Sequence, residues 1–463
     1  MGAESVIRRA GVVSVVTLAV LAVGGPSAGA ISPPEVDPAV VPPSGTAGPV
    51  QPMAQRSECV TSGVIAGTDP AAASPNLLSL ALPEAWKHSR GDGQLVAVID
   101  TGVTPGPRLP EVESGGDFVE STDGLTDCDG HGTLVAGLIA GQPGEDGFSG
   151  VAPNARLISI RQSSAHFAAR DPGEDPAVAQ ANRDVATLAR AVVRAADAGA
   201  RVINISTVTC VPANKNVDQT ELGAALRYAA VERDAVIVAA AGDTRGGMAG
   251  GSACESNPLT DPARPSDPRN WASVNSVSIP SWWQPYVLSV GSLTAGGQPS
   301  QFTMAGPWLG IAAPAENVTS VSNAADGGLA NGMPDSDQGM APISGSGYAA
   351  AYVSGVAALV RSRFPDLSAQ QVVSRLSGTA HAGARSPSNL FGAGSIDPVA
   401  ALTWVVPEGS ESDPAAVRPT AAPPTPAPED PMPRVVAFAG VGVLAILVLV
   451  VVVANAKRKG KNT

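Results

Sequence analysis

Three short segments carry residue types that could perform acid–base and nucleophilic chemistry. Asp100 ends an apolar run just before a Thr-Gly turn, and His131 lies between two glycines at the start of a small-residue stretch. A third segment, residues 343–359, is rich in glycine and small residues and could begin a helix. The acid comes first along the chain, the histidine second and the glycine-rich helix start third. This is one of the chain orders known for serine-hydrolase triads. In such a triad the acid orients and stabilises the imidazole, which takes the proton of the nucleophile.

The segments around these motifs predict a parallel α/β fold. Short continuous apolar runs suit strands that are buried on both faces of a parallel sheet. These runs are residues 95–99, 157–160, 202–205 and 235–239. Residues 184–198 carry apolar side chains at helical spacing. Strands that alternate with helices imply a sheet with helices on both faces, with Asp100 at a strand end and His131 at a helix start.

The two ends of the chain predict export followed by membrane anchoring. Residues 1–30 have the pattern of a secretory signal peptide, with basic residues, a short apolar run and a small-x-small site; an uncleaved N-terminal anchor is the alternative. Residues 435–454 carry no charge, and about 20 residues at ~1.5 Å each cross the ~30 Å hydrocarbon layer. Basic residues in 455–463 predict a cytoplasmic tail, which leaves the rest of the mature chain outside the cytoplasm as a single-pass membrane protein.

Three further segments complete the predicted organisation. Residues 31–75 are rich in Pro, Ala, Ser and Gly and predict an extended N-terminal arm. Residues 76–406 hold the strand and helix patterns, and residues 407–434 predict a Pro-rich linker to the membrane. The net charge of −12 disfavours binding of nucleic acid, because a phosphate backbone requires a basic surface. No calcium-loop pattern is evident, so we expect neither a required metal nor a cofactor.

Four cysteines fit an exported chain. Cys59, Cys128, Cys210 and Cys254 form an even set without a Cys-x-x-Cys pair or a histidine at zinc-binding spacing. Two disulfides are therefore expected, with three possible connectivities, and metal binding is the alternative use of these side chains.

Taken in order, the three motifs and the segments between them resemble the peptidase S8 family of subtilisin-like serine proteases over about residues 76–400. The further matching segments are residues 150–155, 239–243 and 306–314. This resemblance implies a subtilisin-like parallel sheet, with Asp100 and His131 as the acid and the base of the triad.

A narrower resemblance, to the mycosins, rests on the leader, the Pro-rich arm, residues 127–131 and 158–164, and the C-terminal anchor. Mycosins are the membrane-bound subtilisin-like proteases of actinobacterial type VII secretion systems. The resemblance implies an arm that wraps the protease domain and is retained, and a place in the type VII secretion membrane complex. It also implies the disulfides Cys59–Cys128 and Cys210–Cys254.

Two positions depart from the family pattern. The family's nucleophile motif is Gly-Thr-Ser, and a reading without gaps aligns Gly345, Ser346 and Gly347 with it, so that a glycine occupies the position of the nucleophile. The family's oxyanion-hole asparagine aligns with Asp243, whose ionised carboxylate accepts hydrogen bonds and does not donate them. In subtilisin, loss of the nucleophile lowers turnover by ~10⁶ and loss of the oxyanion donor by about 10²–10³, so either change would leave little peptidase activity.

Ser346 is the alternative nucleophile. Adjacent residues at a helix start point about 100° apart, because an α-helix has ~3.6 residues per turn. The hydroxyl of Ser346 would therefore miss His131 unless the turn were rebuilt. Without a nucleophile, Asp100 and His131 could persist as a charge-assisted pair that holds the strand end against the helix.

Three functions are open to such a chain. The first is a catalytically defective mycosin homologue that acts as a membrane-anchored component of the type VII secretion complex. The second is an active serine endopeptidase that cleaves exported protein substrates through Ser346. The third is a peptide-binding module that uses the cleft without cutting. The departures at Gly347 and Asp243 favour the first and third functions over the second.

Overall fold

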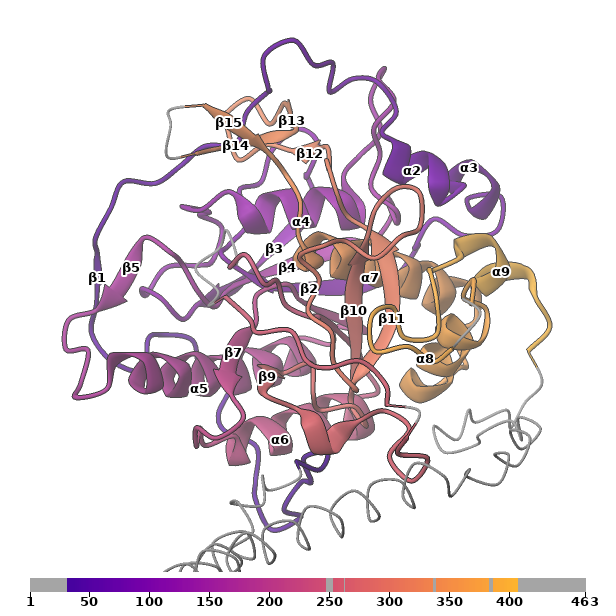
Figure 1. The fold of residues 1–463 in the computed structure, drawn as a ribbon. Coiled ribbons are helices and arrows are strands. Elements are labelled where there is room, and N and C mark those ends of the chain that lie inside the picture. The colour runs from indigo at the N-terminus through magenta and orange to yellow at the C-terminus, as the bar shows by residue number, and fades with distance from the viewer. Residues whose placement is uncertain (1–30, 247–252, 262, 336–338, 383–385, 407–463) are drawn as a thin grey trace, which may run out of the picture. The chain divides into compact units, whose positions relative to one another are not determined.

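Seven parallel strands form the central sheet, in the order β11–β10–β8–β6–β2–β4–β3 (Figure 1). The structure, a computed structural model, describes residues 31–246, 253–261, 263–335, 339–382 and 386–406. The strands are β2 (Leu95–Asp100), β3 (Val112–Asp117), β4 (Arg156–Arg161), β6 (Val202–Ile205), β8 (Val236–Ala240), β10 (Val287–Leu293) and β11 (Leu309–Pro314). Strands β2, β4, β6 and β8 confirm the four apolar runs predicted from the sequence.

Helices cover both faces of this sheet, which confirms the predicted subtilisin-like α/β class. On one face lie α4 (His131–Ala140) and α7 (Ser346–Arg363), and on the other lie α5 (Pro176–Asp197) and α6 (Thr220–Arg227). Successive residues of β2 alternate between the two faces: Val96 and Val98 pack with α4 and α7, whereas Ala97 and Ile99 pack with α5 and α6. Because both faces are covered, a central strand of this sheet has an apolar residue at nearly every position.

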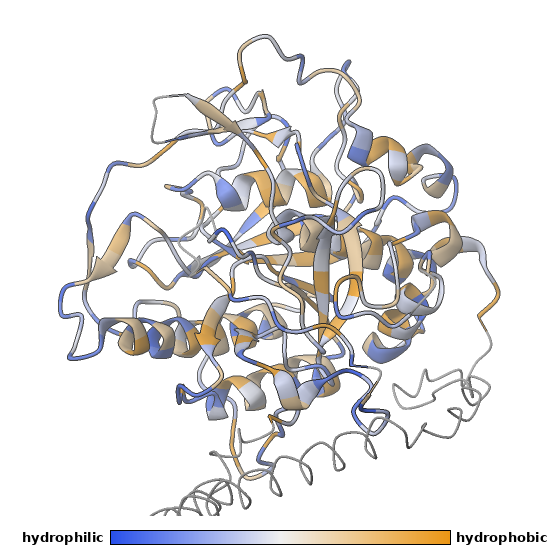
Figure 2. Ribbon diagram, viewed as in Figure 1, coloured by the Kyte–Doolittle hydropathy of each residue, from blue (hydrophilic) through white to orange (hydrophobic). Residues whose placement is uncertain are grey.

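The shorter elements lie around this core. The helices are α2 (Pro75–Ser79), α3 (Leu82–Ala85), α8 (Ala369–Gly378), α9 (Pro398–Thr403), a π-helical turn (Tyr228–Glu232) and a 3₁₀ turn (Trp271–Ser273). The antiparallel pairs are β1 (Met53–Gln55) with β5 (Phe167–Ala169), β7 (Thr209–Pro212) with β9 (Ser276–Ile279), β12 (Ser320–Val321) with β13 (Leu329–Ala330), and β14 (Gly332–Pro334) with β15 (Met340–Pro342). Figure 2 shows hydrophobic residues concentrated along the central strands and their neighbouring helices, with hydrophilic residues on the loops and outer turns.

Helix α5 is longer than the sequence pattern predicts. The predicted helix begins at residue 184, whereas α5 begins at Pro176. The side chain of Asp175 accepts a hydrogen bond from the main-chain N of Val178 (3.3 Å) and caps the first turn. The first two turns are mostly exposed or half-buried, so they carry no apolar stripe that periodicity could detect.

The arm (residues 31–75) is held against the domain along much of its length. Strand β1 pairs with β5, and the guanidinium of Arg190 on α5 donates to the main-chain O of Gly48 (3.1 Å). The structure pairs Cys59 of the arm with Cys128, and Cys210 with Cys254, as the resemblance to mycosins implies. These contacts place the arm along α5 and then beside the loop that precedes α4 (Figure 1).

The predicted leader, linker, membrane span and tail lie outside the described residues. These are residues 1–30, 407–434, 435–454 and 455–463. Within the part of the chain that the structure describes, no helix has the length and apolar character needed to cross a membrane.

Candidate active site

Asp100 and His131 are brought together by the end of β2 and the start of α4. His131 Nδ1 lies 2.8 Å from Asp100 Oδ1, which also accepts from the main-chain N of Thr101 (2.7 Å). Both side chains are buried. Glycines allow this close approach: a Cβ at Gly132 would lie 2.0 Å from the main-chain O of Gly102. The Asp-Thr-Gly and Gly-His-Gly motifs therefore reflect the packing of a strand end against a helix start as well as chemistry.

The protonation of His131 is set by opposing effects. Burial lowers its pKa, but the charge and hydrogen bond of Asp100, together with the charges of Asp127 and Asp129, outweigh burial and raise it. The bond to Asp100 fixes a proton on Nδ1 and leaves Nε2 as the proton acceptor, which is the tautomer that a serine-protease base requires.

Gly347 faces this acceptor. A Cβ built on Gly347 would lie 3.2 Å from His131 Nε2, 3.2 Å from His131 Cε1 and 2.8 Å from the main-chain O of Ser206. Asp100, His131 and the backbone of Gly347 thus form the row that the sequence predicts for an acid, a base and a nucleophile. The row ends at a residue that has no side chain to attack a carbonyl.

Ser346 points elsewhere. Its Oγ accepts a hydrogen bond from the main-chain N of Gly242 (3.1 Å), and its own main-chain N donates to both carboxylate oxygens of Asp243 (3.1 and 3.2 Å). The residue is 2% exposed. Among the hydrogen bonds of the described residues, none joins Ser346 to His131. The hydroxyl therefore lies on the side of α7 that faces the loop after β8.

Asp243 acts as an acceptor at the start of α7. Gly345 is the N-cap residue of that helix and supplies no side-chain hydrogen bond. The carboxylate of Asp243, which is distant in sequence, caps the helix instead by accepting from the main-chain N of Ser346. Burial raises the pKa of Asp243 to about 6, although its bonds to Ser346 and the charges of Arg245 and His131 lower it. In its ionised form the group has no proton to offer a developing oxyanion.

Asp127 is a site residue whose role the sequence reasoning missed. Its carboxylate accepts from five groups: the main-chain N of Asp129, Gly130 and Thr133, and the hydroxyls of Thr101 and Thr133, at 2.6 to 3.2 Å. Burial raises its pKa to about 6. The N-cap residue of α4 is Gly130, which has no side chain to cap the helix. An acidic residue three positions earlier is therefore the sequence signal that could have identified Asp127 as the cap. Asp127 thus fixes the loop that positions His131.

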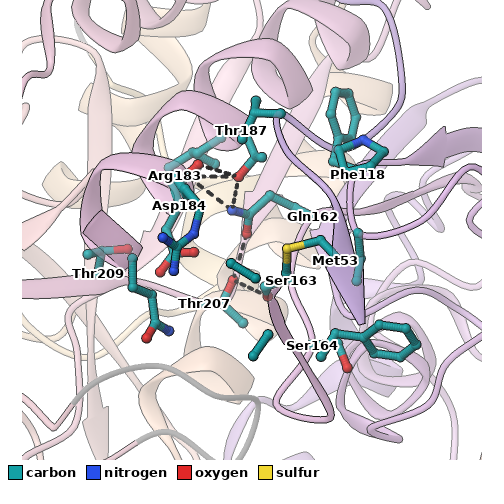
Figure 3. Close-up of a pocket in the computed structure, with 18 of the residues that line it drawn as sticks. Met53, Phe118, Gln162, Ser163, Ser164, Arg183, Asp184, Thr187, Thr207 and Thr209 are labelled. Carbon is teal, nitrogen blue, oxygen red and sulfur yellow. Dashed lines mark hydrogen bonds between the residues drawn. The ribbon is translucent and has the colours of Figure 1, made fainter. Parts of the chain in front are cut away.

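A pocket of about 100 Å³ is lined by the arm, α5 and the segment that follows β4 (Figure 3). The main-chain N of Gln162 in its wall donates to the main-chain O of Asp100 (2.7 Å), and Gln162 Nε2 donates to Thr187 Oγ1 (2.9 Å). Met53 of the arm and Asp184 of α5 also border the pocket. Burial raises the pKa of Asp184 to about 7, with a small opposing effect from the charge of Arg183.

Across the described residues, no group of three or more His, Cys, Asp or Glu side chains is arranged to hold a metal ion.

The fold and this site define a class. Subtilisin-like serine proteases have a parallel sheet with an acid at the end of one strand. The acid pairs with a histidine at the start of a small-residue helix, and a second helix with a glycine-rich start lies beside them. The family model for the subtilase family, peptidase S8, matches residues 91–394.

More similar relatives narrow the class. Mycosin-3 of Mycobacterium tuberculosis is 63% identical over 420 residues, which cover 91% of this chain and 91% of that protein. Mycosin-1 of Mycolicibacterium smegmatis is 47% identical over 413 residues, which cover 88% of this chain and 90% of that protein. The chain therefore belongs to the subtilase family and, within it, to the mycosins.

Solved structures agree with this assignment. The structure of MycP3 protease from the type VII (ESX-3) secretion system is 70% identical, with a TM-score of 0.78 over 81% of this chain and 100% of that one. A chain of the intact ESX-5 inner membrane complex is 47% identical, with a TM-score of 0.79 over 92% of this chain and 100% of that one.

Proposed function

We propose that this protein is a membrane-anchored, extracytoplasmic component of a type VII secretion complex and that it does not cleave peptides. Its subtilisin-like domain then acts as a scaffold, and the pair formed by Asp100 and His131 supports the structure. The observation that carries the proposal is the row that ends at Gly347, where His131 Nε2 faces a residue without a hydroxyl.

Two further observations support the absence of cleavage. Ser346 uses its hydroxyl as an acceptor from Gly242, and Asp243 presents a carboxylate that accepts from Ser346 where the family has an amide donor. The secretion role is supported by the relatives, one of which is a chain of the intact ESX-5 inner membrane complex.

The test separates scaffolding from chemistry. A strain that lacks the gene is complemented with the wild type, with His131→Ala or with Asp100→Asn, and both secretion and recovery of the membrane complex are measured. A scaffold predicts that deletion abolishes both, whereas the two variants keep wild-type secretion at equal protein abundance. A loss of secretion in His131→Ala, with the complex intact, would instead show that the site performs chemistry.

A non-cutting peptide-binding role is the second candidate. It is favoured by the pocket of Figure 3, which could hold a side chain of a bound segment and whose wall residue Gln162 is joined to Asp100 by a main-chain hydrogen bond. Fluorescence anisotropy with labelled peptides from exported proteins tests it. Binding that is saturable, weakened by Thr187→Trp in the pocket wall and without cleavage of the peptide supports this role; no binding excludes it.

A further inference from the structure

A second row of hydroxyl, imidazole and carboxylate lies outside the site described above. Ser57 Oγ on the arm is 2.8 Å from His166 Nδ1, and His166 Nε2 is 3.9 Å from Asp129 Oδ1. None of the three residues belongs to the row of Asp100, His131 and Gly347. The three groups are in the order that a general-base-activated serine requires.

The surroundings of His166 select its tautomer. Asp129 is 1% exposed on its side chain and is fixed by Ser164 Oγ (2.6 Å) and the main-chain N of Ala165 (2.7 Å). A buried carboxylate beside Nε2 favours the proton on that nitrogen, although the distance is too long for a full hydrogen bond. With that tautomer, Nδ1 has a free lone pair that can accept the hydroxyl proton of Ser57. Such distances often shorten only when substrate binds.

Covalent and main-chain ties hold the row in place. The disulfide between Cys59 and Cys128 joins the segment that carries Ser57 to the segment that carries Asp129. On the other side, β1 pairs with β5, and the main-chain N of Arg56 donates to the main-chain O of His166 (2.7 Å). The row therefore sits at a fixed crossing of three segments rather than on a free arm, which is what a positioned nucleophile needs.

The hydroxyl is also accessible. Ser57 is exposed, so an electrophile can reach Oγ, whereas His166 and Asp129 are mostly shielded from water.

We propose that Ser57 is a second nucleophilic site, which accepts acyl groups from small ester substrates with His166 as its base. Ser57 Oγ attacks the ester carbonyl carbon, and His166 Nδ1 takes the hydroxyl proton. The tetrahedral intermediate expels the alcohol, which leaves with that proton, and an acyl ester forms on Ser57. Water, deprotonated by the same nitrogen, then releases the acid and restores the serine. The proposal is independent of the scaffold role, because it uses neither His131 nor Gly347.

The test uses the full-length chain in detergent and a fluorophosphonate probe, with peptide mapping of the adduct. In that reaction Ser57 Oγ displaces fluoride from phosphorus. The expected result is an adduct on Ser57 that disappears in Ser57→Ala and persists in His131→Ala. Ser44 is the matched control, because it is an exposed serine of the same arm whose hydroxyl contacts only Thr46. Its labelling should be slower by a factor of about 10² or more, the usual contribution of a general base.

Two variants of His166 separate a base from a polar tie between arm and domain. In His166→Ala both functions are lost, whereas a glutamine in His166→Gln can keep a hydrogen bond to Ser57 but cannot act as a base at neutral pH. The proposal expects both variants to lower the labelling rate of Ser57 by about 10² or more. It also expects both variants to abolish the dependence of that rate on pH that a single general base produces. Labelling of Ser57 no faster than Ser44, or a wild-type rate in His166→Gln, would overturn it.

Discussion

Restoring a serine at Gly347 is the sharpest perturbation of the candidate site. In Gly347→Ser the new Cβ lies 3.2 Å from His131 Nε2, so its hydroxyl comes within hydrogen-bonding reach of the base. The same Cβ lies 2.8 Å from the main-chain O of Ser206, which must shift. Such overpacking costs about 1–3 kcal/mol, and replacing glycine within a helix returns roughly 0.5 kcal/mol. We therefore expect the melting temperature to fall by about 1–3 °C, with the fold retained.

The activity gained depends on Asp243. In subtilisin, removing one oxyanion-hole donor costs about 10²–10³ in kcat, so Gly347→Ser alone should remain weaker than a complete subtilase by about that factor. The double variant Gly347→Ser with Asp243→Asn should recover it, because an asparagine can donate to the oxyanion while its carbonyl oxygen still accepts from the main-chain N of Ser346.

The assay combines fluorophosphonate labelling with a quenched peptide substrate. An adduct on residue 347 that vanishes when His131→Ala is added, and cleavage that rises by about 10² or more between the single and double variants, would agree with the geometry. The Asp243→Asn variant alone is the control and should not cleave. If the folded double variant neither labels at residue 347 nor cleaves, then His131 does not face this position as a working base, and the reasoning fails.

Three further predictions concern stability. Burial raises the pKa of Asp243 from 3.8 to about 6, so between these pH values the folded state binds a proton that the unfolded state has released. Stability should therefore fall as pH rises from about 4 to 6, and urea titrations should give a flatter fall in Asp243→Asn; the same slope in both proteins would contradict this. Asp127→Ala removes the acceptor of five hydrogen bonds and should cost about 3–5 kcal/mol, with Asp127→Asn costing less in the same titrations. The disulfide between Cys59 and Cys128 closes a 69-residue separation, so replacing both cysteines by alanine should cost about 4 kcal/mol by denaturant unfolding and should make the arm cleavable by added protease.

The sheet could be predicted because its strands are buried on both faces. The continuous apolar runs at 95–99 and 202–205 identify β2 and β6 without knowledge of their neighbours. The start of α5 could not be found in this way, because its first turns lie at the edge of the domain and carry no apolar stripe. Periodicity reports burial, and it is silent where a helix is exposed on most sides.

Some residues of the candidate sites could likewise be predicted from the sequence, and others could not. Asp100, His131 and Gly347 were found from local motifs, whereas Ser57 and His166 belong to segments without any motif and meet only because β1 pairs with β5. Asp127 lies within a segment that resembles the mycosins, but its role could not be predicted. Its five hydrogen bonds depend on how the loop before α4 folds over Thr101. A contact between segments that are distant in sequence leaves no periodic trace in either of them.

The sequence by itself determined the family pattern, the order of acid and base, and the absence of a hydroxyl at residue 347, because each of these is a property of residue identity and spacing. Only the tertiary structure decided where the remaining groups point. Ser346 turns toward Gly242, Asp243 caps α7, and the arm brings Ser57 to His166. Direction is set by the packing of strands and helices against one another, and hydrogen bonds between side chains require both the right distance and the right angle.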